Sequence, residues 1–251
     1  MQRPDMIIPV LIPTKGRIKT SAYKLFDKKY FKVYHFIEPN EIEQYEVPNK
    51  INIGNNGMGI SYVRNYMLEW AKTNDKEWVI FCDDDIKSFG KAVNKKTVTG
   101  TSLIWIEIYN KIKNLPFEIA GINYVQFAWS ETKDYFINKR LVEVCVLVNV
   151  QKITWKYRKE FDLKEDRDFT LQTIKNGYGI IKFNKYYLSA PNIGSNAGGL
   201  QEAYKEKRDE LSIKLFAREW HPFVKIIKKE KRIDGKIDVA GVANYYHKVV
   251  K

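Results

Sequence analysis

The chain has 251 residues, of which 44% are apolar, and its 43 Lys and Arg against 30 Asp and Glu give a formal net charge of +13. This length and composition provide one real hydrophobic core, which excludes a disordered chain or a repeat array, and no apolar run approaches the roughly 18 residues of a membrane span. The two cysteines, Cys82 and Cys145, lie in apolar runs, which excludes a disulfide framework and a Cys-rich zinc site, and we expect a cytoplasmic protein.

Local patterns predict an alternation of strands and helices. Apolar runs that end at Gly, Pro or polar residues indicate strands, and apolar residues at helical spacing indicate helices. In chain order, the predicted elements are strands over 6–12, 32–37 and 51–53, a helix over 60–72, a strand over 78–82, a helix over 101–114, strands over 117–124 and 140–150, a helix over 165–176, a strand over 182–188 and a helix from 200 to about 219.

This alternation predicts a single α/β domain with a mostly parallel, Rossmann-like central sheet flanked by helices. Ligands of such sheets bind at the carboxyl ends of the strands. No segment has the composition of a linker, so we expect one domain over residues 1–222 and a basic C-terminal extension over 223–251 that packs on it.

Three consecutive carboxylates, Asp83, Asp84 and Asp85, follow the predicted strand 78–82 at this ligand edge. Adjacent carboxylates repel one another, and their oxygen ligands suit Mg²⁺ or Mn²⁺, which is commonly held by one or two carboxylates together with substrate phosphates. A solvated turn is the alternative explanation for this feature alone.

The order of motifs around this strand end resembles the nucleotide-sugar half of glycosyltransferases of the GT-A fold. Pro-Thr-Lys-Gly-Arg (13–17) follows the first strand, Asn-Gly-Met-Gly-Ile-Ser-Tyr-Val-Arg-Asn (56–65) opens a helix, and Asp-Asp-Asp (83–85) matches Asp-x-Asp. The family helix motif reads approximately N-x-G-x-x-x-A-R-N, so Val63 replaces the usual Ala. Backbone N–H groups of a Gly-rich turn, and arginines, suit phosphate oxygens.

The resemblance implies a role for each matching residue. Asp83 would face the ribose and also approach the metal, Asp85 would bind the metal, and Asp84 stays ambiguous within the donor site. His221 resembles the late histidine that many GT-A enzymes return to the metal, although a lone His is often only a packed or surface residue. The remaining residues implied in nucleotide-sugar binding are Thr14, Arg17, Gly57, Arg64 and Asn65, and either arginine could instead pair with a surface acid.

Glu-Asp-Arg-Asp (165–168) opens a predicted helix and resembles the Glu-Asp motif that supplies the catalytic base in inverting GT-A enzymes. A carboxylate there can take the proton of an acceptor hydroxyl. We predict Asp166 as the base, with Glu165, or Asp168, as the substitute if the register differs. Acids in a first helical turn also complement the helix dipole without any catalytic role.

The basic charge, which attracts polyanions, favours a nucleic-acid partner. Basic residues concentrate at 15–32 and 225–232, and the second stretch lies near Phe223, Tyr245 and Tyr246, although solvated lysines alone would look the same. With the GT-A motifs and the lack of a membrane segment, the chain is similar to small phage TET-associated glycosyltransferases, which put sugars on hydroxymethylated pyrimidines in DNA.

That similarity implies an inverting hexosyltransferase in the cytoplasm, or the host cytoplasm if phage-encoded. The enzyme would use Mn²⁺ or Mg²⁺ to move a sugar, foremost glucose from UDP-glucose, to a 5-hydroxymethylpyrimidine of double-stranded DNA. Extruding the base would place it on an aromatic side chain, for which the candidates are Trp129, Tyr186, Tyr187 and Trp220. The alternatives are a glycosyltransferase for a surface glycan or lipid-linked acceptor, and a nucleic-acid-binding protein without turnover. Nothing in the sequence indicates an oligomeric state.

Overall fold

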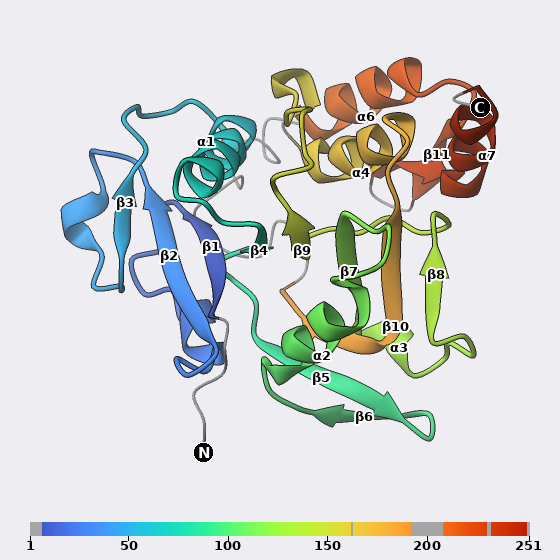
Figure 1. Cartoon of the computed structure of the whole chain (residues 1–251). Coiled ribbons are helices and arrows are strands. Elements are labelled where there is room, and N and C mark those ends of the chain that lie inside the picture. The colour runs from blue at the N-terminus through green and yellow to red at the C-terminus, as the bar shows by residue number, and fades with distance from the viewer. Residues whose placement is uncertain (1–6, 162, 192–207, 230–231, 250–251) are drawn as a thin grey trace.

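Apolar runs bounded by Gly, Pro and polar residues form the strands of one large sheet. The computed structural model describes residues 7–161, 163–191, 208–229 and 232–249 (Figure 1). The strands are β1 (Ile8–Thr14), β2 (Phe31–Ile37), β3 (Lys50–Asn52), β4 (Trp78–Cys82), β5 (Ser88–Val93), β6 (Lys96–Thr99), β7 (Ile119–Tyr124), β8 (Tyr135–Ile137), β9 (Cys145–Asn149), β10 (Ile180–Ser189), β11 (Val224–Lys229) and β12 (Arg232–Ile237). The helices are α1 (Ile60–Thr73), α2 (Leu103–Ile112), α3 (Val125–Ala128), α4 (Glu165–Lys175), α6 (Arg208–Glu219) and α7 (Val239–Val249).

The strand order of the sheet is β3-β2-β1-β4-β9-β7-β10-β5-β6, with β8 pairing β10. Strands β3, β2, β1 and β4 are parallel neighbours, and β7 and β10 are also parallel. Between these two groups β9 runs antiparallel to both β4 and β7. The carboxyl ends of β1, β4, β7 and β10 therefore meet at one edge, as expected for a mostly parallel α/β sheet.

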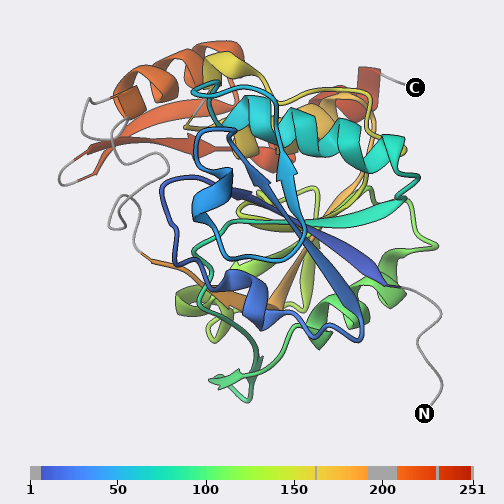
Figure 2. The same ribbon diagram turned by 90° about the vertical axis from the view of Figure 1, so that its left-hand side faces the viewer.

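Helices cover both faces of the sheet, each over its own apolar cluster (Figure 2). Alternation along a buried strand sends neighbouring side chains to opposite faces. In β4, Val79 and Phe81 join the cluster beneath α1, α4, α6 and α7, while Ile80 and Cys82 join the cluster beneath α2. This two-sided burial explains why β4 reads as a continuous apolar run.

The structure confirms the predicted fold class. Several elements, however, were not predicted from the sequence. The hairpin of β5 and β6, strand β8, the hairpin of β11 and β12, and helix α7 are all absent from the sequence-based assignment. Strand β6 is exposed along its whole length, so it carries no buried face to produce an apolar pattern. Residues 192–199 and residues 200–207 of the predicted helix lie outside the described residues.

The C-terminal segment shares the main core. Val224 of β11 and Val239 and Val242 of α7 belong to the apolar cluster that contains Phe169 of α4 and Phe216 of α6. The burial of these apolar side chains in a shared core stabilises the packing of the hairpin and α7 against the rest of the domain. Among the described residues, no helix has the length and apolar character required to cross a bilayer.

The buried His35 of β2 should make stability depend on pH. Burial lowers the pKa of His35 from 6.5 to about 4, so the unfolded chain binds this proton between those values while the folded protein does not. Folding free energy is therefore lost as the pH falls through this window, by up to about 3 kcal/mol. We expect the urea unfolding midpoint of His35→Gln to rise relative to that of the wild type as the pH falls from 7 to 4.5, and a difference that does not change with pH would contradict the prediction.

Candidate active site

The carboxyl end of β4 carries Asp83, Asp84 and Asp85, and two arginines partly neutralise them. Arg17, from the loop after β1, forms an ion pair with Asp84, and its Nη2 lies 3.4 Å from Asp85 Oδ2. Arg64, from the first half of α1, donates through Nη2 to Asp83 Oδ1 at 3.0 Å. Asp84 and Asp85 thus share Arg17, whereas Asp83 is paired with Arg64 from a different element.

The three carboxylates differ in their exposure to solvent. The side chain of Asp84 is 3% exposed, whereas those of Asp83 and Asp85 are 32% and 23% exposed. Burial raises the pKa of Asp84 to about 7 and that of Asp83 to about 6, against the opposing charges of Arg17 and Arg64. The Thr20 hydroxyl donates to the Asp84 carbonyl at 2.7 Å. Asp84 is therefore a buried anchor, and the two carboxylates beside it are accessible to ligands.

Arg64 joins this strand end to the start of α4. Its Nη1 lies 2.9 Å from Glu165 Oε1, and both residues are buried. The guanidinium lies 5.5 Å from the centroid of the Tyr157 ring, which stacks on Phe169 at 4.0 Å. Burial raises the pKa of Glu165, and Arg64 opposes that shift. Arg64 therefore fixes the distance between Asp83 and the first turn of α4.

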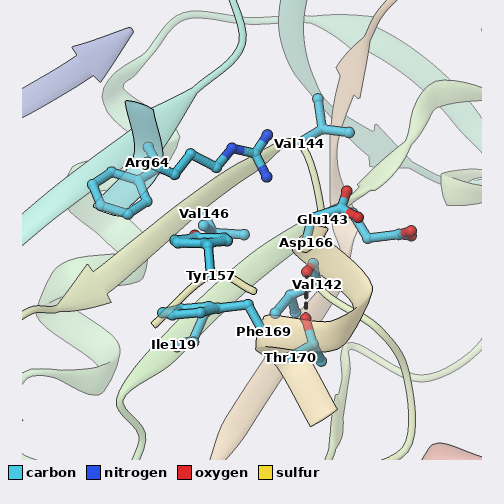
Figure 3. A pocket seen from close by; sticks show the side chains of 11 residues that line it. Arg64, Ile119, Val142, Glu143, Val144, Val146, Tyr157, Asp166, Phe169 and Thr170 are labelled. Carbon is cyan, nitrogen blue, oxygen red and sulfur yellow. Dashed lines mark hydrogen bonds between the residues drawn. The ribbon is translucent and has the colours of Figure 1, made fainter. Parts of the chain in front are cut away.

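A pocket lies beside Arg64 and Tyr157. Asp166 is one of the residues that line it, whereas Glu165 is not. Figure 3 shows Asp166 and Glu143 beside each other, with Arg64 and Tyr157 on the same pocket. Asp166 Oδ1 accepts a hydrogen bond from the N–H of Arg167 at 2.7 Å, and its side chain is partly exposed. Glu165 is 4% exposed and engaged by Arg64. Of the two predicted acids, only Asp166 has a carboxylate that a ligand in the pocket could reach.

Asp168, the other substitute predicted from the sequence, is part of the core. It is 0% exposed and accepts hydrogen bonds from Arg158 at 2.9 and 2.5 Å, from Gln172 at 2.7 Å and from the Trp220 indole at 2.8 Å. A carboxylate held by this many donors stabilises the contact of α4 with the end of α6 and is unsuited to accept a substrate proton. His221, which follows Trp220 in the sequence, is exposed to solvent.

Of three further residues predicted in nucleotide-sugar binding, Thr14 and Asn65 have partners within the protein and Gly57 is exposed. The Thr14 hydroxyl is buried 3.1 Å from His35 Nδ1. The Asn65 side chain donates to the carbonyl of Tyr157 and accepts from its N–H, both at 2.8 Å. Gly57 is exposed with φ +68°, a left-handed conformation that favours glycine, and an added Cβ would meet no atom within 4 Å. Their roles toward a nucleotide stay predictions.

Tyr124 was missed by sequence reasoning. It ends β7 at the same edge of the sheet and is half-buried. Burial raises the pKa of its hydroxyl, and the charges of Glu143, Asp166 and Asp83 add to the shift. The sequence does place Tyr124 at the end of a predicted strand, where ligands of such sheets bind. Its proximity to these carboxylates, however, depends on the order of the strands in the sheet, which the sequence does not show.

The donor set at the end of β4 fits a small divalent cation with a limited number of protein ligands. Asp83 and Asp85 offer accessible carboxylate oxygens, and Asp84 Oδ2 is buried without a hydrogen-bond partner in the described part of the chain. Mg²⁺ and Mn²⁺ accept such oxygens and fill their remaining positions with water or phosphate. Within the described residues, no three His, Cys, Asp or Glu side chains are grouped to hold a metal, so His221 as a third ligand stays a prediction.

Comparison with known proteins identifies a family and a fold. The family model for TET-associated glycosyltransferases matches residues 8–199. No curated protein matches the sequence. Glucosyl-3-phosphoglycerate synthase from Mycobacterium tuberculosis, solved in complex with Mn²⁺, UDP and glucosyl-3-phosphoglycerate, superposes with a TM-score of 0.50 at 10% identity over 93% of this chain and 88% of that chain.

A second structural neighbour is more distant. The glycosyltransferase GlyE of Streptococcus pneumoniae TIGR4 gives a TM-score of 0.38 at 12% identity over 86% of this chain and 64% of that chain. The match to the synthase shows the fold, which is the GT-A fold that the motifs predicted.

Proposed function

Because the chain belongs to the TET-associated glycosyltransferase family and is therefore a glycosyltransferase, we propose that it moves glucose from UDP-glucose to the hydroxyl of a 5-hydroxymethylpyrimidine in DNA. The observation that carries this proposal is that the Arg64 guanidinium binds Asp83 through Nη2 and Glu165 through Nη1, so that the accessible end of β4 lies beside the pocket lined by Asp166. We assign the donor to the side of Asp83 and Asp85 and the acceptor to the side of Asp166. The structural relative from Mycobacterium tuberculosis holds Mn²⁺ and UDP, which supports the same kind of donor here.

On the donor side, Asp83 and Asp85 would hold Mn²⁺ or Mg²⁺ beside the diphosphate of the donor. When bound, the cation stabilises the negative charge of the departing UDP. Arg17 and Arg64 already lie beside these carboxylates and add positive charge to the same region. Asp84, held by Arg17, fixes the position of the strand end.

On the acceptor side, Asp166 would act as general base in a direct displacement. The acceptor hydroxyl oxygen attacks the anomeric carbon of glucose, its proton passes to the Asp166 carboxylate, and the bond from the anomeric carbon to the diphosphate oxygen breaks. UDP leaves with the bonding electron pair, and Asp166 then returns the proton to solvent. Attack from the face opposite UDP inverts the anomeric configuration.

The test is incubation of the purified protein with Mn²⁺, UDP-sugars and DNA that contains either 5-hydroxymethylcytosine or cytosine, followed by mass analysis of the nucleosides. We expect a hexose-sized mass gain confined to the modified base and greatest with UDP-glucose. Hydrolysis of a UDP-sugar without any DNA product would reject DNA as the acceptor and favour a glycan. No consumption of any donor would reject the catalytic proposal itself.

A further inference from the structure

The structure separates the four aromatic residues that the sequence offered for stacking on a target base. Tyr186, Tyr187 and Trp220 are 8%, 3% and 3% exposed, so their rings belong to the core. Trp129 is 50% exposed, and Phe127, two residues before it and not predicted, is 53% exposed. Two large aromatic side chains on one short segment therefore present their rings to solvent.

This segment lies at the edge of the sheet that carries the candidate active site. Helix α3 begins directly after Tyr124, the last residue of β7, and packs against β7 and β10 (Figure 1). Ala128, between the two exposed rings, is 1% exposed and anchors the helix. Tyr124 ends β7 at the same edge of the sheet at which β4 ends before Asp83. A polymer lying on α3 could thus deliver one of its units to this edge.

The chain that follows α3 adds cations in an ordered arrangement. Asn184 of β10 donates through Nδ2 to the carbonyl of Lys133 at 2.9 Å, which ties this segment to the sheet. The Lys133 ammonium and the Arg140 guanidinium lie 5.9 and 5.0 Å from the centroid of the Phe136 ring. Cations held over an aromatic ring in this way keep a defined position on the surface.

The charge of this surface suits a polyanion. Lys133, Lys139 and Arg140 are all exposed. The acids of the same segment are Glu131 and Asp134, and Asp134 is paired with Lys185 of β10. Exposed aromatic rings beside exposed cations are the combination that binds a nucleic-acid strand, because bases stack on the rings and phosphates lie near the cations.

We propose that residues 125–140 form the surface that receives the DNA strand carrying the target base, with Trp129 and Phe127 stacking on bases and Lys133 and Arg140 facing the phosphates. This inference rests on the proposed function and extends it, because it assigns the acceptor to one face of the molecule. The basic hairpin of β11 and β12 is the competing face, and exposed Tyr245 of α7 lies next to Phe223 at its start.

The test compares Trp129→Ala, Phe127→Ala and Tyr245→Ala in steady-state transfer to DNA containing 5-hydroxymethylcytosine, with hydrolysis of UDP-glucose in the absence of DNA as the second readout. We expect the two α3 variants to raise the KM for DNA about tenfold or more, because stacking is lost. Hydrolysis should be unchanged in both, and Trp129→Phe, which keeps a ring, should retain most of the affinity. Tyr245→Ala, with a similarly exposed ring, should match the wild type.

Equal KM values for wild type and both α3 variants would overturn the surface assignment, and a raised KM in Tyr245→Ala alone would move the acceptor to the C-terminal face. If the wild type transfers no sugar to DNA, the proposed function fails, and binding of a fluorescently labelled single-stranded DNA then decides the surface separately. Weaker binding by Trp129→Ala than by Tyr245→Ala supports it. Equal binding, or no binding by the wild type, overturns it.

Discussion

Replacing Asp85 with alanine is expected to lower the rate of sugar transfer at least about 1,000-fold, equivalent to about 4 kcal/mol of transition-state stabilisation. Asp85 has a side chain that is 23% exposed, and its partner Arg17 is also bound to Asp84. The substitution therefore removes a proposed metal ligand without opening the core. The thermal unfolding midpoint should stay close to that of the wild type.

The matched control is Glu69→Ala, which removes one carboxylate from the exposed face of α1. This control should keep wild-type activity, and a chelator should abolish transfer by the wild type until Mn²⁺ is restored. Full activity in Asp85→Ala, or in the presence of chelator, would reject the metal site at the end of β4. Loss of activity in Glu69→Ala as well would show that the effect is not specific to the site.

Replacing Arg64 with methionine is expected to destabilise the protein by about 3–5 kcal/mol, because it leaves the buried Glu165 carboxylate without its counter-charge. Arg64 is 7% exposed and contacts Asp83 and Glu165 at 3.0 and 2.9 Å. Such a loss is a large share of the stability of a typical domain. Urea unfolding measured at pH 7 gives the free-energy difference.

The double variant Arg64→Met with Glu165→Gln tests the cause of that loss. If unpaired charge dominates, the double variant should recover much of the stability, since the glutamine carries no charge to leave uncompensated. If the double variant is as unstable as the single one, the loss comes instead from the packing of Arg64 against Tyr157. Glu165→Gln alone serves as the reference for the change in the acid.

The sequence predicted the main strands and helices well because their signals are local. The buried strand β4 has the predicted bounds, since five consecutive apolar residues end at Asp83. The sequence predicts that helix α4 ends at residue 176. Gly177, which follows, has a φ of +84°, the left-handed conformation that ends many helices. Strands such as β8 are only three residues long, so their formation depends on pairing with β10 rather than on their own pattern.

The sequence by itself determined which chemical groups are present and near which strand ends they lie: the Asp-Asp-Asp run after β4, the arginines of the two motifs and the acids that open α4. The tertiary structure decided which of them are available. Asp84, Glu165 and Asp168 are buried, so a ligand cannot reach their carboxylates. Asp83, Asp85 and Asp166 stay accessible. The physical reason is that exposure and ion pairing depend on residues far away in the chain, such as Arg17 beside Asp84 and Arg64 beside Glu165, which only the packing of the sheet and its helices brings together.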